Sequence, residues 1–173
     1  MDWLTTSGAV AINHADANMQ AHAVVNFLYT FSLVAATVAT HATGIMALGW
    51  CLIRYELRAD RHFGFLHNLG FLIAVIAVLI LLHLIEVEWW SLFYASSGFF
   101  ADRSTAFYFS LTTYANLGYG DVLLPRASRT IGGVEALIGM LMIGWSIAVL
   151  VRLVSRVYDR RMEVWRGFPP TNR

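Results

Sequence analysis

The chain has 173 residues, of which 58% are hydrophobic and 13% are charged. Soluble domains carry about 25% charged residues, so the composition predicts a one-domain membrane protein. The formal net charge of +1 gives no reason to expect a nucleic-acid partner, and the single cysteine excludes an intrachain disulfide and a cysteine-based zinc site.

The first predicted membrane crossing is the apolar run from Val24 to Ile53, which contains no Asp, Glu, Lys or Arg. Its length is sufficient to cross a bilayer, and the absence of repeated arginines excludes an Arg-rich voltage sensor. Small residues recur at every fourth position, which predicts close packing against another helix, although alanine and threonine are also common in membrane helices. They form two stripes, Ala35, Ala39, Thr43, Ala47 and Ala36, Thr40, Gly44.

The second predicted crossing runs from Phe63 to Ile85 and is again uncharged. His83 lies three positions before Glu86, so the two side chains would share one face of this helix and form a hydrogen-bonded pair or a pH sensor. Acidic and aromatic residues follow the crossing and predict a belt at the membrane interface, namely Glu86, Glu88, Trp89, Trp90 and Tyr94.

A short helical pattern from Ser104 to Tyr114 leads into a glycine-rich end. About ten residues are too few to span a bilayer, which needs about 20, and the segment is too apolar for a solvated loop. Non-helical backbone at membrane depth is tolerated only inside protein or beside a watery cavity. The segment therefore predicts a re-entrant pore loop, with Asp102 or Ser104 as the N-cap of its helix.

The third predicted crossing runs from Thr130 to Val151, and Glu135 is its only charged residue. An acid at this depth is either a functional group or a buried hydrogen-bond partner behind the pore loop. Gly139 and Gly144 on the same helix would serve either a gating hinge or close helix packing.

The placement of arginines predicts the orientation of the chain. No arginine precedes the first crossing, whereas Arg54, Arg58 and Arg61 follow it directly. By the positive-inside rule, this loop and the tail are cytoplasmic, the N-terminus is outside, and the chain is a multi-pass protein of the cell (inner) membrane. The basic tail is either a topology anchor or a site for anionic lipid head groups; its arginines are Arg152, Arg156, Arg160, Arg161, Arg166 and Arg173.

The stretch Leu117-Gly118-Tyr119-Gly120-Asp121 resembles the selectivity-filter signature of the pore-loop potassium channels, usually written TVGYGD or TLGYGD. The resemblance extends over Phe65 to Val154 and is greatest to the bacterial one-pore channels, which lack the first helix. It implies an all-α membrane protein with three transmembrane helices, a re-entrant pore helix and filter between the second and third, and a homotetrameric pore. The implied parts are an N-terminal segment with the extra helix (1–62), a pore domain (63–155) and a basic cytoplasmic tail (156–173).

The resemblance also implies a function, which is K⁺ conduction and not enzymatic catalysis. Backbone carbonyls of the filter would replace the water shell of the ion, and no cofactor other than K⁺ is expected. The filter residues are Asn116, Leu117, Gly118, Tyr119 and Gly120, and K⁺ would lie at the backbone of the first four. Glycine adopts positive φ without a Cβ penalty, which would let successive carbonyls face the pore.

The residues that support the filter follow from the same resemblance. Thr112 and Thr113 end the pore helix, and Asp121 lies at the outer mouth. In the family this aspartate is often held by a pore-helix acid and an aromatic donor, whose matching positions here are Thr112 and Tyr108. The Tyr108 hydroxyl is therefore expected to hold Asp121; the alternative is a solvated Asp121 that only attracts cations.

Asn116 departs from the family pattern, which has a threonine at the innermost filter position. An amide NH₂ facing the pore would repel a cation, which predicts a weakly selective cation channel or a non-conducting subunit. If Asn116 forms sideways hydrogen bonds instead, only its carbonyl lines the pore.

Two functions of other classes also fit parts of the sequence. The GYGD stretch matches the GxGD pattern of intramembrane aspartyl proteases, but every other aspartate lies outside the predicted crossings. A bis-histidine haem protein would pair His22 with His83 and His41 with His67 on antiparallel helices. It would leave the filter stretch unexplained.

Overall fold

The computed structural model describes residues 28–54 and 65–165 of the chain. These residues form four α-helices and one short 3-10 helix, without strands. The helices are the first helix (Leu28–Arg54), α2 (Phe65–Ser96), α3 (Arg103–Tyr114) and α4 (Arg129–Trp165), with the 3-10 helix η1 (Arg126–Ser128) before α4. The first helix, α2 and α4 are long and apolar enough to cross a membrane. The prediction of an all-α protein with three such helices is confirmed.

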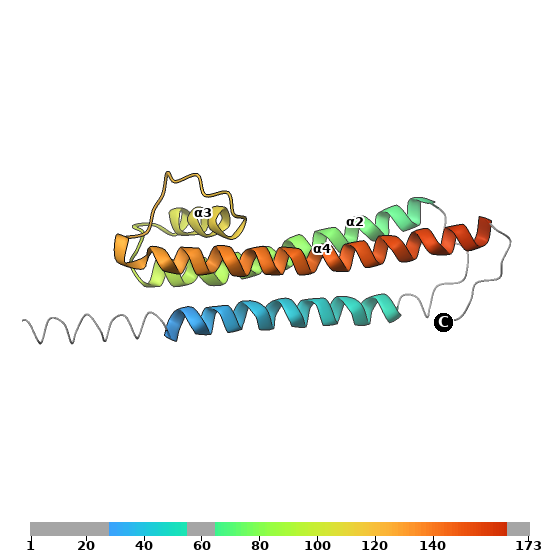
Figure 1. Ribbon diagram of the computed structural model, residues 1–173, viewed down its shortest axis with the longest axis horizontal. Helices are drawn as coiled ribbons and strands as arrows, with labels where there is room; N and C mark the ends of the chain where they lie inside the picture. The colour runs from blue at the N-terminus through green and yellow to red at the C-terminus, as the bar shows by residue number, and fades with distance from the viewer. Residues whose placement is uncertain (1–27, 55–64, 166–173) are drawn as a thin grey trace, which may run out of the picture.

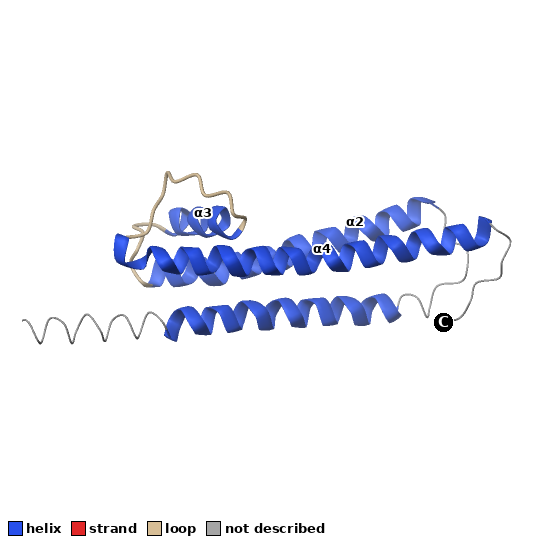
Figure 2. Cartoon of the chain, viewed as in Figure 1, coloured by secondary structure: helices blue, strands red, loops and turns tan. Residues whose placement is uncertain are grey.

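The three long helices lie side by side, and each runs opposite to its sequence neighbour (Figure 1). The short helix α3 lies at the end of the bundle where α2 ends and α4 begins. Loop backbone in the described part of the chain is confined to the segments on either side of α3 (Figure 2). The chain therefore leaves α2, forms a short helix beside the bundle, and returns to the same end, as expected for a re-entrant loop.

α2 continues eleven residues beyond the predicted end at Ile85 and stops at Ser96. Between Ile85 and Gly98 the sequence has no glycine or proline that would end the helix. Gly98 then adopts a left-handed φ of 69° after the helix end. The predicted interfacial belt is wrong for Glu86, Trp90 and Tyr94, because all three are fully buried in the protein. They recur at helical spacing and form the face of α2 that packs against its neighbours.

α3 begins at Arg103, and Asp102 is its N-cap. The Asp102 carboxylate accepts hydrogen bonds from the Ser104 hydroxyl at 2.5 Å, the Thr105 hydroxyl at 2.7 Å and the Thr105 backbone N–H at 2.8 Å. These bonds lower the pKa of Asp102 to about 2. The predicted start at Ser104 is one residue late, since Ser104 supports the cap and does not form it.

The first helix packs closely against α2 at Gly44. A Cβ at this position would lie 2.7 Å from two side-chain carbons of Leu82, so a larger residue would require Leu82 to move. The packed face also carries Thr37, His41 and Leu48, which are buried. The prediction that both small-residue stripes pack is confirmed only at Gly44 within this chain; the stripe Ala35, Ala39, Thr43, Ala47 is exposed.

The apolar core is largest around α3. Trp90 and Tyr94 of α2 pack there with Phe109 of α3 and with Ile131 and Ile138 of α4. The rings of Tyr94 and Phe109 meet edge to face, with centroids 5.1 Å apart. This aromatic core fixes the position of α3, and α3 in turn positions the extended glycine-rich segment 116–120 that follows it, which is called the strand below although it is not a β-strand.

Candidate functional site

The strand after α3 has a repeated backbone conformation. Asn116, Gly118 and Gly120 adopt φ values of 58°, 55° and 77°, whereas Leu117 and Tyr119 do not have positive φ. Such alternation turns successive peptide groups toward the same side, unlike in a β-strand. The prediction that both glycines use positive φ is confirmed. The extension of the pattern to Asn116 was missed, although its spacing of two from Gly118 was a visible signal.

The Asn116 side chain is held by hydrogen bonds to two backbone carbonyls outside the strand. Its amide NH₂ donates to the carbonyl of Tyr114 at 3.2 Å and to the carbonyl of Ala136 on α4 at 3.0 Å. Of the two alternatives, the observed geometry is that of sideways hydrogen bonds. Asparagine tolerates left-handed φ, whereas β-branched threonine is strained there. The backbone thus gives a physical reason for asparagine at this position.

The base of the strand is held by the last turn of α3. The Asn116 N–H donates to the Thr113 carbonyl at 2.9 Å, and the Leu117 N–H donates to the Thr112 carbonyl at 2.8 Å. The Thr112 hydroxyl instead donates back within its own helix, with the carbonyls of Tyr108 and Phe109 at 3.0 and 3.1 Å. Within this chain, Thr112 and Thr113 contact the strand through their backbone.

The outer end of the strand is held as expected. The Tyr108 hydroxyl donates to a carboxylate oxygen of Asp121 at 2.8 Å. This hydrogen bond raises the pKa of Tyr108, because only the protonated hydroxyl can donate it. The face of the strand itself is open: a Cβ added at Gly118 or Gly120 would meet nothing within 4 Å.

Behind α3, Glu135 connects three helices. It is fully buried and accepts hydrogen bonds from the Tyr94 hydroxyl of α2 at 2.7 Å and from the Ser110 hydroxyl of α3 at 2.6 Å. Ser110 also lies 2.9 Å from the Val87 carbonyl. Of the two alternatives for this acid, the structure shows the buried hydrogen-bond partner.

The two glycines of α4 differ in their surroundings. A Cβ at Gly139 would lie 2.3 Å from the carbonyl oxygen of Tyr114, so the end of α3 rests directly on the backbone of α4. A Cβ at Gly144 would meet nothing within 4 Å. The helix is continuous through both residues. Close packing explains Gly139, and the hinge at either residue stays a prediction.

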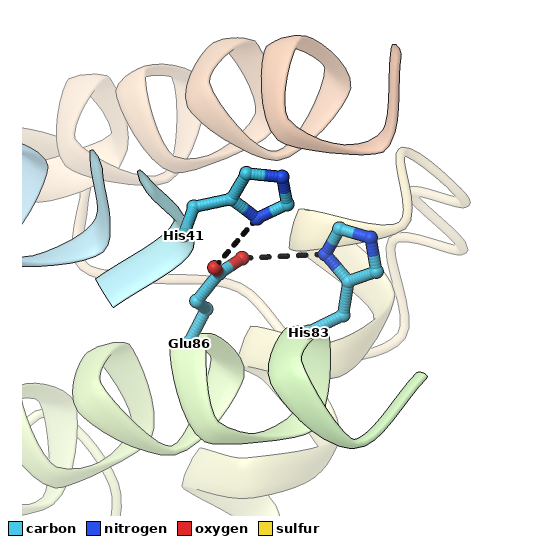
Figure 3. Close-up of side chains that lie close together, drawn as sticks. All are labelled: His41, His83 and Glu86. Carbon is cyan, nitrogen blue, oxygen red and sulfur yellow. Dashed lines mark hydrogen bonds and ion pairs between the residues drawn. The ribbon is translucent and has the colours of Figure 1, made fainter. Parts of the chain in front are cut away.

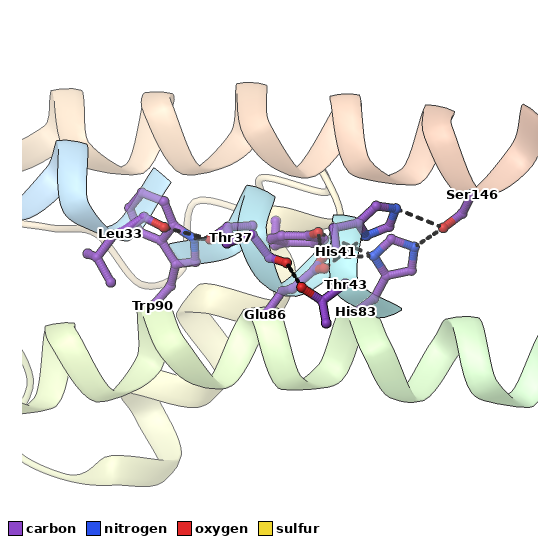
Figure 4. A network of polar contacts seen from close by, with 10 residues as sticks. Leu33, Thr37, His41, Thr43, His83, Glu86, Trp90 and Ser146 are labelled. Atoms are coloured by element: carbon purple, nitrogen blue, oxygen red, sulfur yellow. Dashed lines mark hydrogen bonds and ion pairs between the residues drawn. The ribbon is translucent and has the colours of Figure 1, made fainter. Parts of the chain in front are cut away.

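A second polar cluster joins the first helix to α2, α3 and α4 (Figures 3 and 4). Nδ1 of His41 lies 2.8 Å from Oε1 of Glu86, and Nδ1 of His83 lies 3.2 Å from Oε2. The Tyr114 hydroxyl donates to Oε2 of Glu86. The hydroxyl of Ser146 lies 3.0 Å from Nε2 of His83 and 3.5 Å from Nε2 of His41.

The predicted hydrogen bond between His83 and Glu86 is therefore confirmed, but the contact of Glu86 with a second imidazole, that of His41, was not predicted. His41 is 45 residues away from Glu86 on a different helix, and its place in a long uncharged run was the only sequence signal. The haem pairing of His41 with His67 is wrong, because His41 stacks on His83 with ring centroids 5.3 Å apart. No porphyrin fits between rings in this contact. His22 lies outside the described residues.

The arginine-rich segments are described only in part. The guanidinium of Arg54 lies 4.5 Å from the ring centre of Trp50, and Arg152 and Arg156 are exposed on α4. The prediction of lipid binding also rests on residues 160–173, whose side chains lie outside the described part of the chain.

The intramembrane protease alternative requires two aspartates that face each other. Asp102 instead caps α3, and Asp121 is hydrogen-bonded to Tyr108 and not to a second aspartate.

Residues 69–156 match the sequence model of a family described as ion channels. The chain belongs to this ion channel family. The matched segment contains nearly all of α2, the whole of α3, the strand after it and most of α4. Membership makes the protein a membrane channel and not an enzyme.

Among known proteins, the chain is similar to the potassium voltage-gated channel protein Shal of Drosophila melanogaster. The two are 30% identical over 128 residues, which cover 71% of this chain and 20% of the relative. The chain thus spans about a fifth of the length of that relative. No solved structure matches the chain.

Proposed function

We propose that the channel conducts K⁺ selectively through a ring formed by the filter strand, Asn116 to Gly120, of four identical chains. The observation that carries the proposal is the positive φ at every second residue of this strand. Membership of the ion channel family and the similarity to a protein named as a potassium channel support the same conclusion.

In this mechanism, K⁺ leaves its water shell for backbone carbonyl oxygens of Asn116, Leu117, Gly118 and Tyr119. Alternating backbone handedness lets these oxygens face one side without long side chains among them. The C-terminal end of α3 lies at the base of the strand, and its partial charge of about −0.5 favours a cation there. Binding at several adjacent sites keeps each site weak enough for the ion to leave.

The open face of the strand supports assembly around an axis. All residues from Asn116 to Asp121 are exposed on the surface of the single chain, with Leu117 and Tyr119 at 53% and 65%. Apolar residues of α4 are exposed as well, with Leu137 and Leu141 at 66% and 64%. Neighbouring chains in a closed cyclic ring would cover these groups and complete the pore.

The sideways hydrogen bonds of Asn116 favour selective conduction over the weakly selective alternative. Its NH₂ is engaged by two carbonyls, so it does not add a donor to the ion path. The proposed orientation has the N-terminus outside and the C-terminus in the cytoplasm of the cell (inner) membrane, because the arginines gather after the first crossing and in the tail.

Flux measurements on the purified channel in liposomes test the proposal. We expect a K⁺ gradient, but not a Na⁺ gradient, to drive a flux that Ba²⁺ blocks, and native mass spectrometry to report four chains. Equal K⁺ and Na⁺ flux would establish the weakly selective alternative, and no flux would establish the non-conducting one. A dimer or monomer would overturn the ring itself.

A pair of glycine variants separates the filter from general folding. Gly118→Ala forces a side chain into φ of 55°, although space for the Cβ is free, so we expect selective flux to be lost. Gly133→Ala on α4 is the matched control, because its Cβ also meets nothing within 4 Å and its φ is not positive. Equal flux in both variants would contradict the proposed role of the strand.

A further inference from the structure

We propose that His41, His83 and Glu86 bind a divalent transition-metal ion of the zinc type, which fastens the first helix to the pore domain. One ligand atom from each residue lies within 4.8 Å of the other two. Two histidines and a carboxylate form the donor set of open zinc sites. The proposal is independent of K⁺ selectivity, because it concerns a site outside the filter strand.

The distances between donor atoms fit a shared ion. Zinc bonds to nitrogen and oxygen are about 2.0–2.2 Å long, so two ligand atoms at angles of roughly 90–110° lie about 2.8–3.5 Å apart. Here Nδ1 of His41 lies 2.8 Å from Oε1 of Glu86, and Nδ1 of His83 lies 3.2 Å from Oε2. Both histidines present Nδ1 to the same carboxylate and all three ligand atoms lie within 4.8 Å of one another, so an ion among them would replace the two hydrogen bonds.

The hydrogen bonds around Ser146 are compatible with a cation at this point, and Nδ1 of His83 also lies 3.2 Å from the Tyr114 hydroxyl. If both Nδ1 atoms carried hydrogen toward Glu86, both Nε2 atoms would be acceptors, yet the single hydroxyl hydrogen of Ser146 can serve only one of them. A metal on the Nδ1 side reverses this arrangement. Both Nε2–H groups then donate to the Ser146 oxygen, which has two lone pairs.

The outer partners are those that metal ligands use. Ligating histidines almost always donate their other N–H to a nearby acceptor, and ligating carboxylates are themselves hydrogen-bonded. Ser146 of α4 fills the first role, and the Tyr114 hydroxyl of α3 fills the second by donating to Glu86. The site is therefore supported from every helix that surrounds it.

Charge balance points the same way. Glu86 and His41 are fully buried, and the ion pairs of Glu86 within the described residues are with His41 and His83 alone. Burying an ionised carboxylate is costly without a partner charge, and a metal cation shared with the two imidazoles would supply one. The His83 side chain is 19% exposed in the single chain, so the chain does not enclose the cluster completely.

The position of the site suggests its effect. His41 belongs to the first helix, which precedes the matched segment 69–156, whereas Glu86 contacts Tyr114 at the last residue of the pore helix. A bound ion would hold the first helix against the segment that positions the filter strand. Zinc is therefore expected to raise the melting temperature of the channel.

Metal binding is tested on the full chain purified without a polyhistidine tag and stripped with chelator. We expect zinc to compete with a chromophoric chelator at one ion per chain, and Co²⁺ to give the visible absorption of a histidine-ligated site. His41→Gln and Glu86→Gln should each weaken zinc binding by at least about 100-fold, and Ser146→Ala by about 10–100-fold.

Glu135→Gln is the matched control, since it neutralises a second buried acid that contacts no histidine. It should leave zinc affinity unchanged. If the Glu86 variant fails to fold, the Co²⁺ absorption of the wild type is compared with that of the His83→Asn variant, which changes a partly exposed residue and should lose the absorption of the site. Absence of stoichiometric zinc binding, with the cluster holding only a proton, would overturn the proposal, as would zinc binding that persists in His41→Gln.

Discussion

Two buried carboxylates, Glu86 of α2 and Glu135 of α4, each accept a hydrogen bond from α3 but differ in their other partners. Glu135 accepts hydrogen bonds from two hydroxyl groups, those of Tyr94 and Ser110. Glu86 contacts two imidazoles and the Tyr114 hydroxyl. Both acids have no exposed surface, so burial alone does not distinguish them.

The comparison teaches that the partners determine what a buried acid can do. Hydroxyl groups donate hydrogen bonds but neither bind protons near neutral pH nor ligate zinc readily, so the partners of Glu135 act as hydrogen-bond donors that connect α2 and α3 to α4. Imidazoles do both. The partners of Glu86 can therefore bind a proton or a metal ion, whereas the partners of Glu135 cannot.

The largest effect is expected from Gly139→Ala, which should displace Tyr114 and so disturb the cluster around Glu86. The new Cβ would lie 2.3 Å from the Tyr114 carbonyl oxygen, a backbone atom that cannot rotate away. We expect a loss of about 3 kcal/mol of stability per chain, at the upper end for overpacking, together with weaker zinc binding as Tyr114 leaves Glu86. Thermal unfolding and chelator competition measure both.

Gly144→Ala is the control for this variant, because its Cβ meets no atom within 4 Å. Alanine in a helix interior is up to about 1 kcal/mol more favourable than glycine, so its melting temperature should be unchanged or higher. Equal destabilisation by both variants would refute the close contact between α3 and α4.

Tyr94→Phe tests the Glu135 network and is expected to have the next largest effect. It leaves the buried Glu135 with Ser110 as its remaining donor, and leaving a buried acceptor without its hydrogen bond costs about 2 kcal/mol. The melting temperature should fall while zinc affinity stays at the wild-type value. A fall in zinc affinity would show that the two networks are not separate.

Tyr114→Phe is the matched change in the Glu86 cluster. Glu86 keeps both imidazoles as partners, so the expected loss is smaller, about 1 kcal/mol per chain. Zinc binding should weaken, because the hydroxyl supports a ligand. A larger destabilisation than in Tyr94→Phe would reverse the proposed difference between the two acids.

Tyr108→Phe extends the comparison to an exposed acid, Asp121, and is expected to change stability least. Water replaces the lost hydrogen bond, so the melting temperature should not move, but the outer end of the filter strand is less restrained and conduction should be lost faster. Single-channel recordings that show identical kinetics would exclude this role.

The same bond predicts a pH dependence with a defined sign. The pKa of Tyr108 is raised by Asp121, so the bond contributes fully below the ordinary tyrosine pKa of about 10 and is lost as the pH rises through the higher folded value. Wild type should approach the kinetics of Tyr108→Phe only at strongly alkaline pH.

Local rules explain which predictions were successful. The N-cap at Asp102, the short helix before the glycines and the positive φ of Gly118 and Gly120 each depend on a few neighbouring residues. The belt after Ile85 failed because acidic and aromatic residues suit both a membrane interface and a buried helix face. Only the packing of α2 against the first helix, α3 and α4 distinguishes the two for Glu86, Trp90 and Tyr94.

The sequence by itself determined the three long apolar helices, the short helix between the last two, and the glycine-bearing strand. Bilayer thickness and backbone sterics constrain contiguous residues, so both can be recognised from a single continuous segment of the sequence. The tertiary structure decided the partners of the two buried acids and brought His41 to Glu86. Those contacts depend on the rotation and register of helices that are distant in the chain, and no local pattern specifies either quantity.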